Sequence, residues 1–315
     1  MATLTDVAKK ANVSKMTVSR VINHPEQVTD ELKELVYAAM KELNYKPNRL
    51  AKALANQRTQ MVKLFILEEM ESVEPYYMNL LIGIASELDK HSYGLQFLTA
   101  ESNNLGQSDG YIICGMRESD FENIKALEEP VVLFGENSHG YDFVDSDNKK
   151  NIETACEYCL KRGYKKLVYI EMDIQEPFSA NRRAGYMTVT KKYGIEPVIL
   201  QFKNDSDDVY DYITQHINQF EKNTAFVCAS DRLGLGVVRA LKFANLHVPE
   251  DFGVIGHDGV FLDQISYPKL TTIQQDVKGM GEACARLILQ RIKNKDLPQK
   301  KVYYPSTISK GGSIR

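Results

Sequence analysis

The chain has 315 residues, of which 43% are hydrophobic and 26% charged, an ordinary composition for a soluble globular protein of about two domains. No apolar run approaches the ~18 residues of a membrane span, and the N-terminal stretch MATLTDVAKKANVS lacks the apolar core of a signal peptide, so we expect a cytoplasmic protein without a membrane partner. The cysteines are few, odd in number and mostly set in apolar runs, which favours reduced, buried thiols: Cys114, Cys156, Cys159, Cys228 and Cys284.

The net charge of −3 hides an asymmetry between the two ends of the chain. Residues 1–60 contain ten Lys and Arg against six Asp and Glu, a net charge of +4, and the remainder has 29 against 36, a net charge of −7. A basic head on an acidic body indicates that the head meets a polyanion and the body does not.

Three helical patterns fit within residues 1–46. The first begins at Thr3, with Asp6 as its capping-box partner, and ends at Asn12, which can take the left-handed conformation of a tight turn. Ser14 caps a second helix, KMTVSRVIN, and Thr29 caps a third, DELKELVYAAMKELNY. The apolar faces of the second and third helices comprise Val18, Val21 and Ile22, and Leu32, Leu35, Val36, Ala39, Met40 and Leu43.

Two short helices joined by about three residues and closed by a third are typical of a helix-turn-helix, whose second helix enters the major groove. The outward residues of the second helix suit that role. Arg20 can donate a bidentate pair to guanine, Lys15 can reach guanine or phosphate, and Met16 can press on a thymine methyl. On spacing alone, a plain three-helix bundle with solvated Lys and Arg remains the alternative.

The stretch TLTDVAKKANVSKMTVSRVINHPEQVTDELKELVYAAMKELNYKPNRLAKAL resembles the head of a lactose-repressor (LacI/GalR) family transcriptional regulator. This resemblance implies that Lys15, Met16 and Arg20 read bases. It places a further set at phosphates, Thr5, Ser14, Thr17 and Ser19, and adds Asn23 to the DNA-binding residues. The implied partner is double-stranded operator DNA.

Residues 47–60 contain NRLAKALANQ, a short basic helical pattern with too few apolar residues to anchor a core, and an isolated helix of this length is marginal in water. The resemblance implies a hinge helix that orders when two subunits sit on an operator. Leu54 would then be the wedge that enters the minor groove, and Ala51 would let two hinge helices approach closely. The alternative for Leu54 is a linker leucine packed on the body.

From residue 61 onward, short apolar β-type runs alternate with amphipathic helical stretches, which predicts parallel βαβ units in a doubly wound sheet. Roughly ten strands are too many for one sheet. We therefore predict an α/β body of two subdomains with a cleft between them, resembling periplasmic binding proteins, with chain crossings near residues 160 and 290. The predicted organisation is a helix-turn-helix headpiece at 1–46, a hinge or linker at 47–60, and an effector-binding and dimerisation domain at 61–315.

Candidate ligand residues follow the apolar runs, because ligands of open α/β sheets sit at the carboxyl ends of strands. Aromatic faces with paired polar groups suit a sugar, although ordinary surface loops remain the alternative. The family resemblance implies that Arg182, in RRAGY, is the effector-binding arginine. It also implies that Asp258, in HDG, is the effector carboxylate. The full predicted effector set is Tyr76, Tyr77, Phe178, Arg182, Ser230, Asp231 and Asp258.

The body departs from the family pattern in places. His257 stands where an aromatic residue is usual, and Gly259 replaces a second acid, so the polarity around Asp258 is open. The segment LTAESNNLGQSDGYII leaves little room for a second helix of the first subdomain, and its shortening would widen one edge of the cleft. No heptad helix follows STISKGG, so we expect a homodimer rather than a tetramer.

Other chemistry is weaker. Cys156 and Cys159 lie within a helical pattern without a second metal-spaced pair, which favours a buried helix face. Asp145 and Asp147 are interpreted as turn carboxylates rather than a glycosidase pair, and no nucleophile–base motif is present, so we expect no enzyme, metal or cofactor. The sequence predicts a repressor of sugar-utilisation genes that a small sugar releases from its operator. A co-repressor response and a sugar-binding transport protein are the alternatives.

Overall fold

The computed structural model describes residues 2–23, 25–45, 58–68, 75–102 and 106–315. It divides into two compact units, Met1–Met61 with Gly106–Asp109, and Val62–Leu105 with Gly110–Arg315. We call the three-helix part of the first unit the headpiece and the second unit the body. The predicted hinge falls mostly on residues 46–57, so Ala51 and Leu54 lie outside the described residues.

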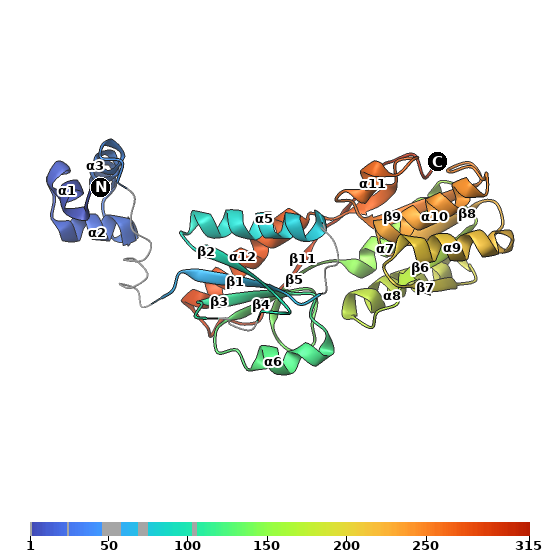
Figure 1. Ribbon diagram of the computed structural model, residues 1–315, viewed down its shortest axis with the longest axis horizontal. Helices are drawn as coiled ribbons and strands as arrows, with labels where there is room; N and C mark the ends of the chain where they lie inside the picture. The colour runs from blue at the N-terminus through green and yellow to red at the C-terminus, as the bar shows by residue number, and fades with distance from the viewer. Residues whose placement is uncertain (1, 24, 46–57, 69–74, 103–105) are drawn as a thin grey trace. The chain divides into compact units, whose positions relative to one another are not determined.

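The headpiece consists of helices α1 (Leu4–Lys10), α2 (Lys15–Asn23) and α3 (Asp30–Glu42), with the 3-10 turn η1 (Pro25–Gln27) before α3 (Figure 1). Its first turn is the predicted one. Thr3 Oγ1 accepts from the Asp6 amide at 3.3 Å while the Asp6 carboxylate accepts from the Thr3 amide at 2.8 Å, a complete capping box. Asn12 has φ 52°, and the Thr17 amide donates to Ser14 Oγ at 3.0 Å, which confirms the turn and the second cap.

The structure corrects the prediction for the third helix in three respects. The helix ends at Glu42 rather than Tyr45, Thr29 makes no side-chain capping bond, and Leu35 is 54% exposed. Leu35 lies at the edge of the predicted stripe, whereas Val36 and Ala39 occupy its buried centre. The buried set is Val7, Ala8, Ala11, Val18, Val21, Val36 and Ala39.

The body contains two six-stranded sheets, as the number of strands predicts. The first has the order β11-β5-β4-β3-β1-β2 and the second β12-β10-β9-β8-β6-β7. The ladders between neighbours β1, β3, β4, β5 and β11 are parallel, and β10 with β12 forms an antiparallel pair at the edge of the second sheet. The strands of the first sheet are β1 (Met61–Ile66), β2 (Gly94–Thr99), β3 (Gly110–Cys114), β4 (Val131–Phe134), β5 (Asp142–Ser146) and β11 (Lys301–Tyr304). Those of the second are β6 (Lys166–Met172), β7 (Val198–Phe202), β8 (Thr224–Cys228), β9 (Phe252–Asp258), β10 (Thr271–Gln274) and β12 (Thr307–Ser309).

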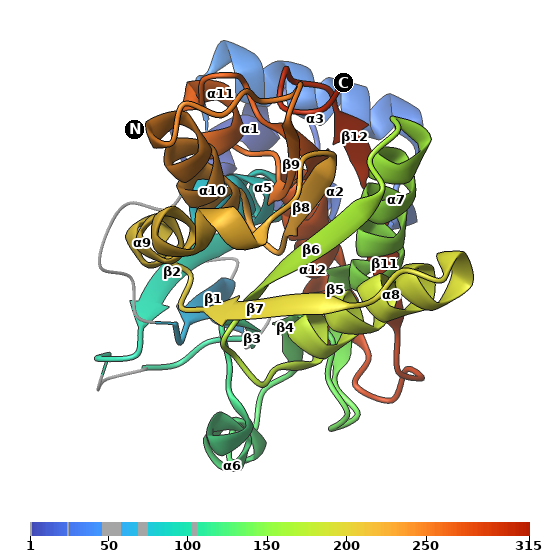
Figure 2. The ribbon, with the colours of Figure 1, turned by 90° about the vertical axis from the view of Figure 1, so that its right-hand side faces the viewer.

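Helices cover both faces of each sheet, which makes the body a doubly wound α/β structure. In the first subdomain, α5 (Pro75–Lys90) and α12 (Val277–Lys293) lie on one face, with η2 (Glu118–Asp120) and α6 (Phe121–Lys125) on the other (Figure 1). In the second, α7 (Asn148–Lys161) and α8 (Pro177–Tyr193) lie opposite α9 (Ser206–His216) and α10 (Asp231–Phe243) (Figure 2). The short η3 (Ile217–Gln219) and α11 (Leu262–Ile265) complete the second subdomain. The described part of the segment between β2 and β3 holds no helix, as its shortness predicts.

The chain crosses between the subdomains three times, at β5 to α7, β10 to α12 and β11 to β12. The predicted positions of two crossings, near residues 160 and 290, are therefore wrong, each by the length of one helix. The third crossing was not predicted. Ile152 and Cys156 place α7 in the core of the second subdomain, while Met280 and Cys284 place α12 in the core of the first. An amphipathic pattern shows that a helix covers a sheet, but it does not show which sheet. The prediction therefore placed the crossings after these two helices, whereas in the structure they fall before them.

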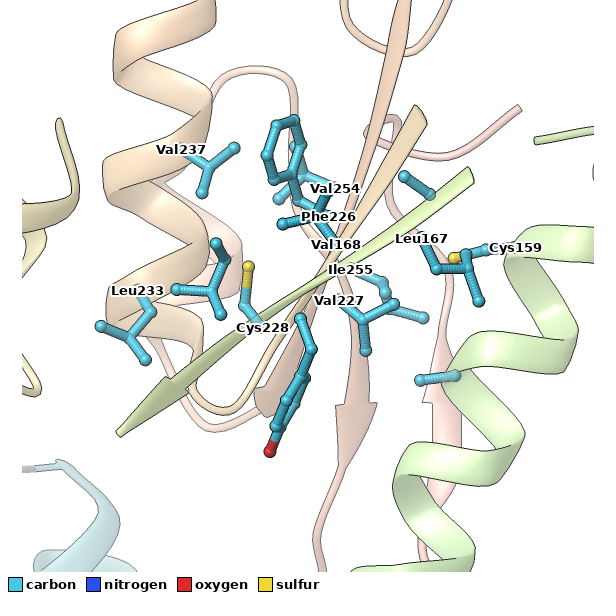
Figure 3. Close-up of a cluster of buried hydrophobic side chains, with 14 of the residues drawn as sticks. Cys159, Leu167, Val168, Phe226, Val227, Cys228, Leu233, Val237, Val254 and Ile255 are labelled. Carbon is cyan, nitrogen blue, oxygen red and sulfur yellow. The ribbon is translucent and has the colours of Figure 1, made fainter. Parts of the chain in front are cut away.

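The second subdomain has a dense apolar core between β8 and its covering helices (Figure 3). Phe226 and Cys228 project from β8 toward Leu233 and Val237 of α10, and Cys159 approaches from α7. All five cysteines are free and buried, so the predicted helix-face role of Cys156 and Cys159 is confirmed. Among the described helices, none is long and apolar enough to cross a membrane.

Candidate functional site

Helix α2 separates a buried face from an exposed one as its sequence predicts. Val18 and Val21 are fully buried in the headpiece core, whereas Met16 is 70% exposed and Lys15 and Arg20 are exposed beside it. The structure therefore presents the three predicted base-reading side chains to solvent on one helix. A cation and a long apolar side chain can reach base edges from such a face.

The predicted phosphate-contacting hydroxyls surround this helix. The Ser14 and Thr17 hydroxyls lie 2.8 Å apart, and Ser14 Oγ also caps the helix, so its position is fixed by the backbone. Thr5 is exposed on α1, and Ser19 is partly exposed on α2. Asn23 is the last residue of α2.

The body contains a cavity of about 400 Å³ between its two subdomains, which we call the cleft. Six of the seven predicted effector residues line it: Tyr76, Tyr77, Phe178, Arg182, Ser230 and Asp258. The two tyrosines come from the start of α5 in the first subdomain, and the others come from α8, the start of α10 and the end of β9 in the second. Residues separated by up to 182 positions in sequence are thus gathered at one cavity by the strand order.

Arg182 is held at the cleft by two internal hydrogen bonds. Its Nε donates to Asn148 Oδ1 at 2.8 Å and its Nη1 donates to the Ala229 carbonyl at 2.6 Å, while the guanidinium carbon lies 5.1 Å from the Phe178 ring centroid. Asn148 in turn donates to Asp145 Oδ1 at 3.1 Å. The arginine therefore has little freedom to move and presents the remainder of its guanidinium group to the cavity.

The other members of the Arg-x-x-Gly-Tyr pattern are structural. A Cβ on Gly185 would lie 2.3 Å from the Lys149 carbonyl oxygen, so only glycine allows α8 to pack this closely on α7. Tyr186 is fully buried, and its hydroxyl donates to the Leu167 carbonyl at 2.9 Å. The motif therefore anchors the helix on which Arg182 is carried.

Asp231 does not line the cleft, which corrects the prediction. It is 1% exposed and accepts from Thr272 Oγ1 at 2.6 Å and from the Gly259 amide at 2.8 Å. Burial, with Asp258 nearby, raises the pKa of its carboxyl to about 8. Ser230 and Asp231 begin the same helix as cap and first residue, and adjacent positions point in different directions, so only the serine faces the cavity.

The turn after β9 accounts for Gly259, one of the two departures from the family pattern. Asp258 has φ 133° and Gly259 has φ 65°, a backbone path that favours glycine, and a Cβ on Gly259 would lie 2.6 Å from the Gln274 Cα. Asp231 holds this turn through the Gly259 amide. A second acid at position 259 would be strained, and burial raises the pKa of the remaining Asp258 carboxyl to about 6.

His257 lies beneath the cleft rather than in it. It is fully buried, with Nε2 3.2 Å from Asn151 Nδ2 and Nδ1 3.3 Å from Asp258 Oδ1, and burial lowers its pKa well below the usual range. Gln275 donates to the same Asp258 oxygen at 3.1 Å and accepts from the Tyr76 hydroxyl at 3.4 Å. A chain of polar contacts thus links a tyrosine of the first subdomain to the buried histidine of the second.

The sequence missed several lining residues of the first subdomain, including Glu68, Phe134, Glu136 and Asp145. Asp145 is not a turn carboxylate: it lies near the end of β5, accepts from the Glu136 and Ser146 amides at 3.0 and 2.7 Å, and burial raises its pKa. Asp147 does cap a helix, accepting from the Lys150 amide. The rule that ligands meet strand ends would have found Asp145 had β5 been predicted. No cluster of three or more His, Cys, Asp or Glu suited to a metal ion occurs in the described ranges.

Comparison with known proteins gives two family matches, to the bacterial regulatory proteins of the lacI family over residues 3–48 and to a periplasmic binding protein-like domain over residues 156–314. The HTH-type transcriptional regulator YvdE of Bacillus subtilis (strain 168) is 50% identical over 305 residues, covering 96% of each chain. The HTH-type transcriptional repressor PurR of Klebsiella pneumoniae subsp. pneumoniae is 32% identical, covering 94% of this chain and 92% of that protein.

Two solved structures share the fold over nearly the whole chain. The complex of the transcriptional regulator CelR with cellobiose has a TM-score of 0.74 at 24% identity, covering 99% of this chain and 100% of that one. The lac repressor dimer bound to operator and the anti-inducer ONPF has a TM-score of 0.73 at 23% identity, covering 99% and 98%. With its helix-turn-helix headpiece and its two-subdomain α/β body, the chain belongs to the lacI family of bacterial transcriptional regulators.

Proposed function

We propose that this regulator is a homodimeric repressor of sugar-utilisation genes, and that a small sugar bound in the cleft releases it from its operator. The observation that carries the proposal is the composition of the cleft, which combines aromatic rings with hydrogen-bonding groups from both subdomains. Sugars offer apolar C–H faces and paired hydroxyls to such a site. The CelR complex with cellobiose and the operator-bound lac repressor dimer, which share the fold, support the ligand class and the dimer.

On the DNA side, Arg20 would pair with guanine, Lys15 would reach guanine or phosphate, and Met16 would contact a thymine methyl. The hydroxyls of Thr5, Ser14, Thr17 and Ser19 would hold phosphates, which fix register without reading sequence. Leu54 would enter the minor groove at the centre of the operator, with Ala51 at the contact of the two hinge helices.

The release mechanism is a shift between two arrangements of the subdomains. The cleft is already bridged where Asn181 Nδ2 of α8 donates to Glu136 Oε2 of the first subdomain at 2.7 Å. A ligand that contacts both sides of the cavity favours one arrangement by its difference in affinity for the two. That arrangement would hold the two hinge helices of a dimer apart and so weaken operator binding.

Selection of duplexes from a randomised pool, followed by fluorescence anisotropy at fixed salt, tests the DNA-binding part. Arg20→Ala should weaken binding to the selected site by about 5- to 150-fold, which corresponds to the ~1–3 kcal/mol of a bidentate base contact. It should also relax the preference for guanine at one position of that site. Lys41→Ala on α3, outside the predicted reading face, is the matched control. Equal losses in both variants would contradict the assignment of α2.

Titration of the bound operator with neutral sugars tests the regulatory part. Release by a sugar supports an inducer, tighter binding supports the co-repressor alternative, and a protein that binds sugar but no duplex would be a transport protein. Arg182→Ala should abolish the sugar response and spare operator binding. Leu54→Ala should weaken binding to the selected site far more than binding to random duplex. Equal losses of affinity for both duplexes would exclude Leu54 as a wedge in the minor groove.

A further inference from the structure

We infer that the cleft selects an uncharged polyhydroxyl ligand, a sugar that carries no phosphate or carboxylate group. The inference rests on the proposed function, in which the cleft is the effector site, and it narrows the class of effector. Three features of the cleft carry it: the excess of carboxylates, the internal engagement of Arg117 and Arg182, and the occupied starts of the helices at the cleft.

Carboxylates outnumber cations on the walls of the cavity. Six carboxylates line the cavity with three guanidinium groups, a formal excess of three negative charges. A phosphate ester brings up to two further negative charges, and like charges at contact distance repel each other. The carboxylates are Glu68, Glu136, Asp145, Glu176, Asp205 and Asp258, and the cations are Arg117, Arg182 and Arg232.

Other groups of the protein engage the guanidinium groups of Arg117 and Arg182. Arg117 lies 3.3 Å from a Glu68 oxygen and 3.8 Å from a Glu176 oxygen, so two carboxylates share its charge. Arg182 donates through two of its nitrogens to Asn148 and to the Ala229 carbonyl. A phosphate is bound best by a bidentate arginine, and the carboxylates beside Arg117 and the acceptors of Arg182 Nε and Nη1 reduce what these two arginines can offer it.

Helix N-termini are the other elements that attract anions, and three of them begin at the cleft. Groups of the protein itself already occupy these starts. Helix α8 begins with Pro177, which has no N–H. Asp205 accepts from the Asp207 and Asp208 amides of α9 at 2.6 and 3.2 Å. The Ser230 hydroxyl accepts from the Leu233 amide of α10. Each helix start therefore offers fewer free amides to an anionic ligand.

The same groups suit a neutral sugar. Carboxylate oxygens accept hydrogen bonds from hydroxyls, and Asp145 and Asp258 offer them from the two opposite subdomains. Tyr76 packs edge-on to Phe134, with ring centroids 6.1 Å apart, which provides apolar surface for C–H groups. A cavity of about 400 Å³ lies within the ~300–1,000 Å³ of small-molecule sites. An amine is the other class that negative walls admit, but the Arg182 guanidinium occupies the Phe178 face that an ammonium group would use.

Calorimetric titration of the full-length protein with matched pairs of probes tests the inference. The pairs are glucose with glucose 6-phosphate, ribose with ribose 5-phosphate, and glucose with glucuronate and glucosamine; cellobiose and maltose extend the neutral arm. We expect saturable binding of at least one neutral sugar, lost in Arg182→Ala, and at least tenfold weaker binding of its charged counterpart. A phosphate ester, acid or amine that binds as tightly as its neutral counterpart overturns the inference, and so does failure of every neutral probe.

A charge-removing variant sharpens the test. Asp205→Asn keeps a side chain that caps helices well and removes one negative charge from the wall, so it should narrow the discrimination between the neutral and phosphorylated probes at least threefold. Glu157→Gln, a body carboxylate paired with Lys192 outside the cleft, should leave the discrimination unchanged. Unchanged discrimination in Asp205→Asn would contradict the role of wall charge.

Operator anisotropy with the same probes separates this inference from the proposed function. A neutral sugar that binds without altering operator affinity contradicts the proposed function and supports the ligand class. A phosphate ester that releases the protein from its operator contradicts the ligand class and supports the proposed function.

Discussion

The headpiece and the body place their candidate functional residues in opposite ways. In the headpiece, the predicted reading side chains lie on one helix within residues 14–23 and project outward from a core of seven valines and alanines. In the body, the cleft is lined by residues from Glu68 to Asp258, brought together only by the order of strands in two sheets. Function is local in sequence where it rests on an exposed helix face, and distributed where it rests on a cavity.

The largest effect is expected from truncating a buried side chain in the core of the body. Phe226 is fully buried and packs against Phe220 and Phe252, so Phe226→Ala should lower the free energy of unfolding of the body by about 3–5 kcal/mol. Phe243→Ala, at a phenylalanine that is 67% exposed, is the matched control and should cost far less. Chemical denaturation followed by hydrogen exchange would report both. Loss of protection in α1–α3 of Phe226→Ala as well would show that the two units unfold together.

A smaller effect is expected at the contact of α7 and α8. Gly185→Ala places a methyl group 2.3 Å from a backbone oxygen and should destabilise the body by ~1–3 kcal/mol, because two helices must separate. It should also weaken the sugar binding that we propose for the cleft, since Arg182 is carried on the displaced helix. Thr188→Ala, on the exposed face of α8, should change stability by no more than about 0.5 kcal/mol. Equal stability of the two variants in thermal unfolding would exclude close packing as the reason for glycine.

The buried carboxylates of the body predict a pH dependence that the headpiece does not share. Burial raises the pKa of Asp231 to about 8, so in the folded state this group stays protonated where an unfolded aspartate ionises, near pH 4. The unfolded state loses its proton first, and stability therefore falls as pH rises from about 4 to about 8. An asparagine side chain is neutral at every pH in this range, so Asp231→Asn should flatten the slope in thermal unfolding of the body. A slope identical to that of the native protein would contradict the raised pKa.

The success of the sequence-based predictions also differs between the headpiece and the body. Capping by Thr3 and Ser14, the turn at Asn12 and the buried face of α2 depend on neighbours within four residues, and all were predictable. Leu35 was not, because whether a stripe's edge is buried depends on how closely the partner helices approach. The apolar runs of the body are present as strands, and the most apolar of them, β3 and β8, are buried throughout, as is typical of parallel strands covered on both faces.

The rest of the body depended on contacts that no local pattern contains. The strand DFVDS is short and polar at both ends, so β5 was missed and with it the place of Asp145 in the cleft. Asp231 follows a strand end, as the ligand rule requires, yet the cap geometry of α10 turns it inward. Which sheet α7 covers is settled by its packing on α8, and this moved the predicted crossing by a whole helix.

The smallest expected effect separates two threonines of the headpiece that look alike in sequence. Both Thr3 and Thr29 precede a helix, but only Thr3 accepts a hydrogen bond from the backbone of the first turn, from the Asp6 amide. Thr3→Ala should therefore lower headpiece stability by ~1 kcal/mol, whereas Thr29→Ala should be nearly neutral, because its hydroxyl satisfies no amide of α3. Hydrogen exchange of α1 and α3 in the full chain measures both, and equal losses of protection would mean that residue type at the cap matters more than the bond seen here. The buried residues of the headpiece core are only valines and alanines, so a loss of ~1 kcal/mol is a sizeable fraction of the stability that this small unit can have.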